Sequence, residues 1–226
     1  MIDKPPFWVV NDSETSKNTT TLQKWLEEKD YPISRRKNLR SGIVHRLDKE
    51  TSGLLLVAKD EESFIKLQSQ FKQRKVSKGY FALVHGRLTK RGVIQTPIGR
   101  LPWNRKRFGV VPGGKPAITY YQPQKIYKKA GNFFSFVKVF PKTGRTHQIR
   151  VHFKYLGFPI VSDDLYAGRK TFRDDRNWCP RLFLHAFSLK FTHPKTNEKV
   201  GFVLPLAKDL AKALSFCDLV DDKLDI

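Results

Sequence analysis

Short segments rich in aromatic and β-branched residues recur along the chain, and this feature restricts its possible folds most strongly. Several of them alternate apolar with polar residues, as strands do when one face of a sheet is buried. The pattern predicts strands at residues 7–10, 53–59, 79–85, 117–127, 133–140, 182–192 and 200–204.

Helical signals are fewer. Asp60 can cap a helix that has Glu61 and Glu62 in its first turn. Apolar residues at helical spacing predict helices at residues 21–29, 60–74, 146–156 and 206–216. Strands outnumber helices and do not alternate with them, which favours an α+β fold with a mixed, mainly antiparallel sheet flanked by helices.

No internal repeat and no linker rich in proline, glycine or serine divides the 226 residues. We therefore expect a single domain over residues 1–226. Its core is expected at about residues 3–206, followed by a C-terminal helix and an acidic tail at 207–226.

The charge balance indicates a polyanionic partner. The chain has 43 Lys and Arg against 21 Asp and Glu, a net charge of +22, which exceeds what solubility favours. No apolar run approaches the length of a spanning helix, and the start lacks the layout of a signal peptide. Cys179 and Cys217 are too few for a disulfide framework. We expect a cytoplasmic protein with reduced thiols, no membrane partner and a monomeric state.

Basic residues cluster in segments read as loops, close to the aromatic residues Trp103, Phe108 and Tyr127. Charge runs are often only solvated surface, but stacking combined with phosphate contacts is how single-stranded or loop RNA is held. This combination favours nucleic-acid binding. The clusters are Arg35, Arg36, Lys37 and Arg40; Arg100, Arg105, Lys106 and Arg107; and Lys125, Lys128 and Lys129.

Three common kinds of site lack support in the sequence. His147 and His152 are five residues apart, so they do not share a helical face as a metal-binding pair does. No nucleophile-elbow sequence is present, and Gly113-Gly114-Lys115 lacks the rest of a phosphate-binding loop. We expect neither a metal nor a cofactor.

Two dense polar segments could carry chemistry. Residues 42–53 form a charged loop directly before an apolar strand, and such a loop is a good platform for a site. In isolation, Asp48 there could simply pair with Arg46 or Lys49. Residues 143–150 place two arginines, a histidine and a glutamine at the start of a helix, which also suits an ordinary surface.

At these segments the sequence resembles the RluA-type pseudouridine synthases. His45-Arg46-Leu47-Asp48, with the Lys-Glu-Thr-Ser-Gly that follows, is similar to the signature around the catalytic Asp of the family. Residues 78–84 resemble its tyrosine-bearing strand, and residues 144–150 resemble its third motif. Shorter matches occur in the family's order at residues 97–100, 114–117, 184–186 and 191–194, so that the resemblance runs from about residue 3 to 206.

The resemblance implies the family's catalytic fold around a basic cleft, with no cofactor. It assigns Asp48 as the catalytic carboxylate, Tyr80 to stacking on the uracil, and Arg145 as the ion-pair partner that keeps Asp48 charged. Arg46 is expected to fill the stack that a flipped nucleotide leaves. The other residues that we expect to contact RNA are His45, Ile149, Arg150, Arg105, Lys106 and Arg107.

Large-subunit ribosomal RNA is the expected substrate by resemblance, with transfer RNA as the alternative. Lys4-Pro5-Pro6-Phe7 departs from the family's Lys-Pro-Ala-Gly, so we expect an irregular sheet edge there, and we expect a catalytic domain without an S4-like module. An inactive RNA-binding module and a metal-dependent nuclease remain as other classes. The intact Asp48, Tyr80 and Arg145 argue against the first, and sensitivity to a chelator would favour the second.

Overall fold

The computed structural model describes residues 1–12 and 20–222, except the side chains of Arg105 and Lys106. The chain forms two compact units, and we describe each by itself. The first unit comprises Met1–Ser77 and Ala186–Leu204, and the second comprises Lys78–His185 and Pro205–Ile226. The expectation of a single domain stays a prediction.

The first unit contains paired β-strands. Strand β1 (Ile2–Lys4) pairs antiparallel with β2 (Ser52–Leu55), and β2 neighbours β9 (Leu184–Thr192), which pairs antiparallel with β10 (Lys199–Val203). The helical elements of this unit are α1 (Leu22–Glu27), the 3-10 segment η2 (Lys37–Gly42) and α2 (Glu61–Lys72).

Helix α2 begins where the sequence predicts. The Asp60 carboxylate accepts the Ser63 N–H at 2.8 Å, which satisfies one of the amides that the first turn leaves without a partner. Phe64 and Leu67 face inward and join a buried cluster with Leu54 and Phe191. The predicted helix at 60–74 is therefore confirmed.

The second unit contains an antiparallel set of strands. Its strands run in the order β3 (Ser77–His85), β8 (Asn132–Pro141), β7 (Ile118–Lys129) and β11 (Asp218–Asp221), and β4 (Gly92–Gln95) also pairs with β7. Helices α3 (Gln148–Tyr155), α4 (Arg169–Arg176) and α5 (Lys208–Leu214) accompany it. A core cluster includes Leu83, Val137, Phe153, Phe183 and Leu210.

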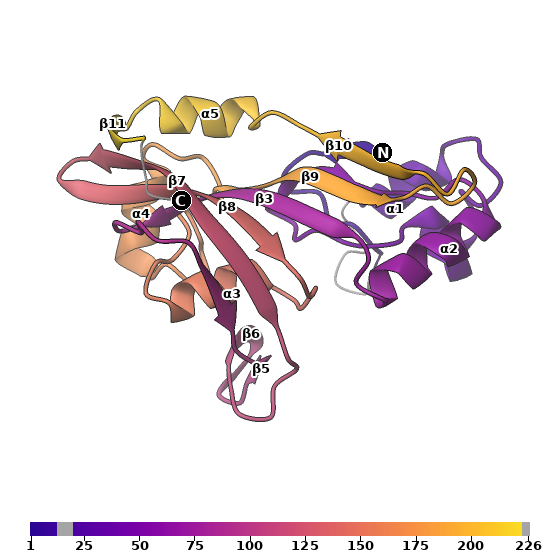
Figure 1. The fold of residues 1–226 in the computed structure, drawn as a ribbon, viewed down its shortest axis with the longest axis horizontal. Coiled ribbons are helices and arrows are strands. Elements are labelled where there is room, and N and C mark those ends of the chain that lie inside the picture. Colours follow the sequence, from indigo (N-terminus) through magenta and orange to yellow (C-terminus); the bar gives the residue numbers. More distant parts are fainter. Residues whose placement is uncertain (13–19, 223–226) are drawn as a thin grey trace. The chain divides into compact units, whose positions relative to one another are not determined.

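Strands β5 (Ile98–Leu101) and β6 (Asn104–Val110) form a separate antiparallel hairpin. Figure 1 shows this hairpin beside α3. The sequence did not predict it, because a basic run interrupted by Gly99 and Gly109 has the composition of a loop.

The predicted α+β class with a mainly antiparallel sheet is confirmed, and three local predictions are wrong. Residues 7–10 do not form a strand, because Phe7 follows two prolines and adopts a left-handed φ of 68°, while Val9 makes only an isolated bridge. The basic residues near 100 and 107 lie in strands rather than loops, and so do Lys125, Lys128 and Lys129.

The third wrong prediction concerns the acidic end. Asp218 lies opposite Lys128 in the β11–β7 ladder, so complementary charges accompany an ordered edge strand instead of a tail. Asp225 lies outside the described residues. Within residues 1–12 and 20–222, no helix has the length and apolar character needed to cross a membrane.

Candidate active site

The Asp48 loop is held by backbone contacts within the first unit. The Gly42 carbonyl accepts the Ala58 N–H at 2.9 Å, and a β-carbon at Gly42 would meet the Ala58 oxygen at 2.0 Å, so only glycine fits there. The Asp48 carbonyl accepts the Thr51 N–H at 3.2 Å, which closes a turn. Leu47 is buried and Asp48 is partly exposed, so Leu47 anchors the loop while Asp48 remains accessible to solvent.

Lys4 also supports this loop, and sequence reasoning did not identify it. Its ammonium donates to the carbonyls of Pro5, Trp8 and Lys49 at 2.8, 3.0 and 3.2 Å. The Lys4 side chain is fully buried, so these acceptors replace the water that a charged group loses on burial. Nothing in the sequence around Lys4 distinguishes it from an exposed lysine.

The His45 ring is held by contacts with the backbone of Leu56 and the ring of Phe71. Its Nε2 accepts the Leu56 N–H at 2.9 Å, and its ring stacks on Phe71 at 4.6 Å between centroids. Arg46 is exposed. The roles expected for His45 and Arg46 in RNA binding stay predictions.

Tyr80 lies on β3 opposite Val139 of β8 and packs partly buried against the core cluster of the second unit. Two residues earlier on this strand, Lys78 donates to the Thr143 carbonyl at 3.2 Å. Burial lowers the pKa of Lys78 to about 8, because the charged ammonium loses hydration. Lys78 thus ties the strand of Tyr80 to the turn that leads to Arg145.

Gln148 organises the turn that carries Arg145. Its Oε1 accepts from the Thr143 hydroxyl at 2.7 Å and from the Arg145 N–H at 3.0 Å. Its Nε2 donates to the Ile118 carbonyl at 2.9 Å, which fastens the turn to β7. The Arg145 Nε donates to the Pro116 carbonyl at 3.1 Å, so the guanidinium has a defined orientation.

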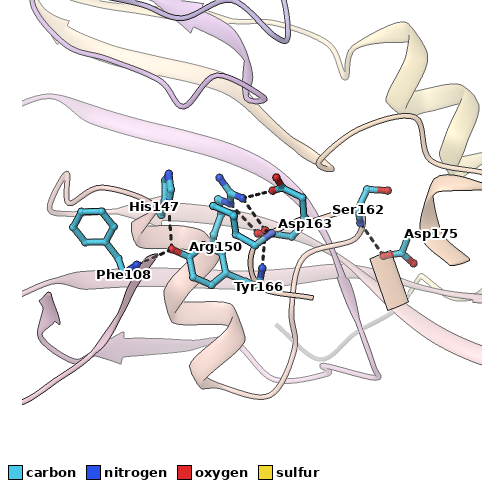
Figure 2. A network of polar contacts seen from close by, with 9 residues as sticks. Phe108, His147, Arg150, Ser162, Asp163, Tyr166 and Asp175 are labelled. Carbon is cyan, nitrogen blue, oxygen red and sulfur yellow. Dashed lines mark hydrogen bonds and ion pairs between the residues drawn. The ribbon is translucent and has the colours of Figure 1, made fainter. Parts of the chain in front are cut away.

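Helix α3 buries two residues that we expected to contact RNA. Ile149 is 6% exposed and belongs to the core cluster. Arg150 forms a bidentate ion pair with Asp163, at 2.8 Å from Nε and 2.7 Å from Nη2, and its Nη2 also lies 3.0 Å from Asp164 (Figure 2). The buried ion pair with Asp163 gives Arg150 a structural role. The expected contact between Arg150 and RNA stays a prediction.

The β5–β6 hairpin carries the basic segment at 105–107. Arg100 is exposed and its guanidinium lies 5.0 Å from the centre of the Phe108 ring. Trp103, between the strands, is 79% exposed, and Arg107 is exposed. The side chains of Arg105 and Lys106 lie outside the described part of the chain.

The predicted site residues are divided between the two units. Asp48, Arg46 and His45 belong to the first unit. The second unit contains Tyr80, Arg145, Ile149, Arg150 and the segment 105–107. Within the described ranges, no group of three or more His, Cys, Asp or Glu side chains has a geometry suited to a metal ion.

The sequence is similar to one protein-family model and to proteins of several organisms. The family model described as RNA pseudouridylate synthase matches residues 1–155. An uncharacterized RNA pseudouridine synthase of Chloroflexus aurantiacus is 44% identical over 172 residues, covering 76% of this chain and 52% of that protein. The ribosomal large subunit pseudouridine synthase D of Pseudomonas aeruginosa is 38% identical over 224 residues, covering 95% of this chain and 68% of that protein. The chain thus spans only about half to two thirds of these relatives.

Among solved structures, the human protein RNA pseudouridylate synthase domain containing 1 superposes with a TM-score of 0.74 at 30% identity. The match covers 99% of this chain and 86% of the human one. The human protein RNA pseudouridylate synthase domain containing 4 shares the fold, with a TM-score of 0.69 at 22% identity.

Proposed function

The chain belongs to the RNA pseudouridylate synthase family, and from this premise we propose that it isomerises selected uridines of structured RNA to pseudouridine. The observation that carries the proposal is the match of the family model over residues 1–155. That range contains Asp48, Tyr80 and Arg145, the three residues to which the sequence motifs assign the reaction.

The reaction needs few chemical groups. It breaks the bond from the ribose to the base nitrogen, turns the uracil, and rejoins ribose and base through carbon, so that no water is consumed. A glycosidase needs two carboxylates because it must also activate water or protonate a leaving group that departs. Here the base turns but does not leave the site, and a single carboxylate suffices. We assign that role to Asp48, which attacks the sugar or assists departure of the base.

Arg145 and Tyr80 complete the assignment. A guanidinium favours the charged form of a neighbouring carboxylate, and this is the role that we assign to Arg145. The hydrogen bonds that Arg145 donates support this role, because the bond from its backbone N–H to Gln148 holds the turn and the bond from its Nε to Pro116 limits the directions that the side chain can take. Tyr80 is assigned to stacking on the uracil, a contact worth about 1–3 kcal/mol per base.

RNA binding is assigned first to the β5–β6 hairpin. Arg100 and Arg107 offer exposed cations, and Trp103 offers an exposed ring on which a base can stack. A uridine within a stem or loop must be flipped out at a cost of a few kcal/mol, and Arg46 is assigned to the space that it leaves.

Large-subunit ribosomal RNA is the proposed substrate, because relatives such as the one from P. aeruginosa are named for it. Transfer RNA is the second candidate. The test is to incubate the purified chain separately with unmodified ribosomal RNA and with unmodified transfer RNA, and to map pseudouridines by sequencing.

If the proposed function is correct, new pseudouridine appears at one or a few positions of the large-subunit RNA. Product in transfer RNA alone would move the substrate to the second candidate. Binding of both RNAs without product would indicate an inactive RNA-binding module. Cleavage of the RNA that stops on adding a chelator would instead identify a nuclease.

A further inference from the structure

The Tyr166 hydroxyl joins three segments of the second unit. It accepts the backbone N–H of Phe108 in β6 at 3.2 Å, and it lies 3.0 Å from Nδ1 of His147, the residue that precedes α3. Figure 2 shows the phenol between the two partners. Since the oxygen already accepts from an amide, its own proton can be donated to Nδ1 of a neutral imidazole.

Tyr166 is held firmly from behind. Its backbone N–H donates to Asp163 at 3.0 Å, and the Arg150 guanidinium lies 5.2 Å from its ring centre. The residue is 7% exposed. The buried Arg150–Asp163 ion pair therefore fixes the place of the ring, and the hydroxyl emerges at a defined point.

His147 meets this hydroxyl from a left-handed backbone conformation. Its φ of 53° and ψ of 23° lie in the left-handed region, which residues other than glycine adopt uncommonly and which restricts the direction of the side chain. Its ring packs edge-on against Phe108 and Tyr166, at 5.8 Å in both cases. His147 thus contacts both the hairpin and the residue that binds the hairpin backbone.

These contacts hold the hairpin at a point beyond its base. At the base, Ile98 exchanges two backbone hydrogen bonds with Lys115, at 3.0 and 2.8 Å. Phe108 lies opposite Arg100, two residues further toward the turn. A bond at Phe108 therefore restrains the part of the hairpin that carries the exposed cations and Trp103.

We propose that Tyr166 and His147 are positioning residues that pre-organise the β5–β6 hairpin for RNA, a role that rests on the proposed function. A binding arm that is ordered before it meets its ligand loses less conformational entropy on binding. The hydroxyl supplies the bond to Phe108, and the imidazole keeps the hydroxyl aligned. Neither residue needs to touch the reacting uridine.

Tyr166→Phe tests the bond directly, because it removes one oxygen and keeps the ring. We expect amide hydrogen exchange at Phe108 to become about fivefold faster or more, as for the loss of one hydrogen bond, with exchange in the core of the unit unchanged. On large-subunit RNA, KM should rise about three- to tenfold with kcat within about twofold, the pattern of lost uniform binding. Tyr155→Phe is the matched control, since Tyr155 lies on α3 and is 60% exposed.

His147 variants supply the rescue. Asn tolerates the left-handed region, and its side-chain oxygen can take the place of Nδ1. We expect His147→Asn to keep most of the RNA affinity and the slow exchange at Phe108. His147→Gly also suits the backbone but lacks the acceptor, so we expect it to behave like Tyr166→Phe.

Two results would overturn the inference: an unchanged exchange rate at Phe108 in Tyr166→Phe, or a KM no different from that of Tyr155→Phe. If the wild-type chain forms no pseudouridine, the proposed function fails by itself. In that case binding of the same ribosomal RNA still decides the inference. Weaker binding by Tyr166→Phe than by Tyr155→Phe supports it, and equal binding overturns it.

Discussion

The Arg150 guanidinium meets two carboxylates that differ in exposure, and this difference predicts unequal costs for two similar substitutions. The Asp163 side chain is 0% exposed and that of Asp164 is 49% exposed, while Arg150 is 1% exposed. Removing one partner of a buried ion pair leaves an uncompensated charge and costs about 3–5 kcal/mol. An exposed pair contributes about 0–1 kcal/mol because water screens it.

Asp163→Asn should therefore destabilise the fold by about 3–5 kcal/mol, and Asp164→Asn by at most about 1 kcal/mol. Asn keeps an acceptor for the N–H groups of Leu165 and Tyr166, which bind the Asp163 carboxylate at 3.0 Å. The substitution thus removes mainly the charge and one side of the bidentate contact.

Urea unfolding at neutral pH measures both variants, and thermal unfolding gives a second reading. In a chain of this size, 1 kcal/mol shifts Tm by about 2–4 °C, so Asp163→Asn should lower it by about 6–20 °C. If Asp163→Asn costs no more than Asp164→Asn, the buried pair does not carry the stability that we assign to it.

Three further predictions concern Asp60, Lys78 and the basic segment at residues 105–107. Asp60→Ala should lower the free energy of unfolding in urea by about 1 kcal/mol, because it removes the cap on the Ser63 N–H. Since that hydrogen bond lowers the pKa of Asp60, the difference in stability between variant and wild type should vanish in acid. A difference in stability that persists in acid would contradict the cap. Lys78 has a folded pKa of about 8 against 10.5 unfolded, so wild-type stability should rise with pH between these values. Lys78→Met should then stabilise by at most about 3 kcal/mol at pH 7 and not at all near pH 10.5, whereas a gain independent of pH would refute burial of the charge as its cause. Neutralising residues 105–107 together should flatten the salt dependence of RNA binding by up to about one logarithmic unit per lost phosphate contact, and an unchanged slope would place the RNA elsewhere.

Local patterns predicted the elements whose own residues determine them. Asp60 followed by two acids and an apolar stripe gives helix α2, because the cap and the buried face agree. The alternating segments near 80 and 135 give β3 and β8, which pair along their length. In such segments the sequence pattern and the packing favour the same structure.

Elements that depend on distant partners were missed. Helix α4 is polar along most of its length and lacks an apolar stripe; its Asp175 accepts the Ser162 N–H at 2.8 Å and pairs with His85 at 2.9 Å. Strand β11 is stable as an edge of β7, and nothing in its own residues announces that partner. Long-range pairing of this kind leaves little trace in a single sequence.

The candidate site shows the same division. The motifs around Asp48 and Arg145 identify the residues assigned to chemistry, whereas some of the residues that support them lie elsewhere in the chain. Lys4 supports the Asp48 loop from 45 residues away, and Tyr166 reaches His147 from 19 residues away. Lys4 and Tyr166 have ordinary structural uses in any sequence, so only the folded chain distinguishes them.

Pseudouridine formation by Asp48→Asn tests the central claim most directly. The variant and the wild type would be incubated with the same unmodified large-subunit RNA, with Glu50→Gln as a control that changes another acid of the same loop. We predict that Asp48→Asn folds, binds the RNA with nearly wild-type affinity and forms no detectable pseudouridine, while Glu50→Gln retains activity. Wild-type amounts of product from Asp48→Asn would contradict the account.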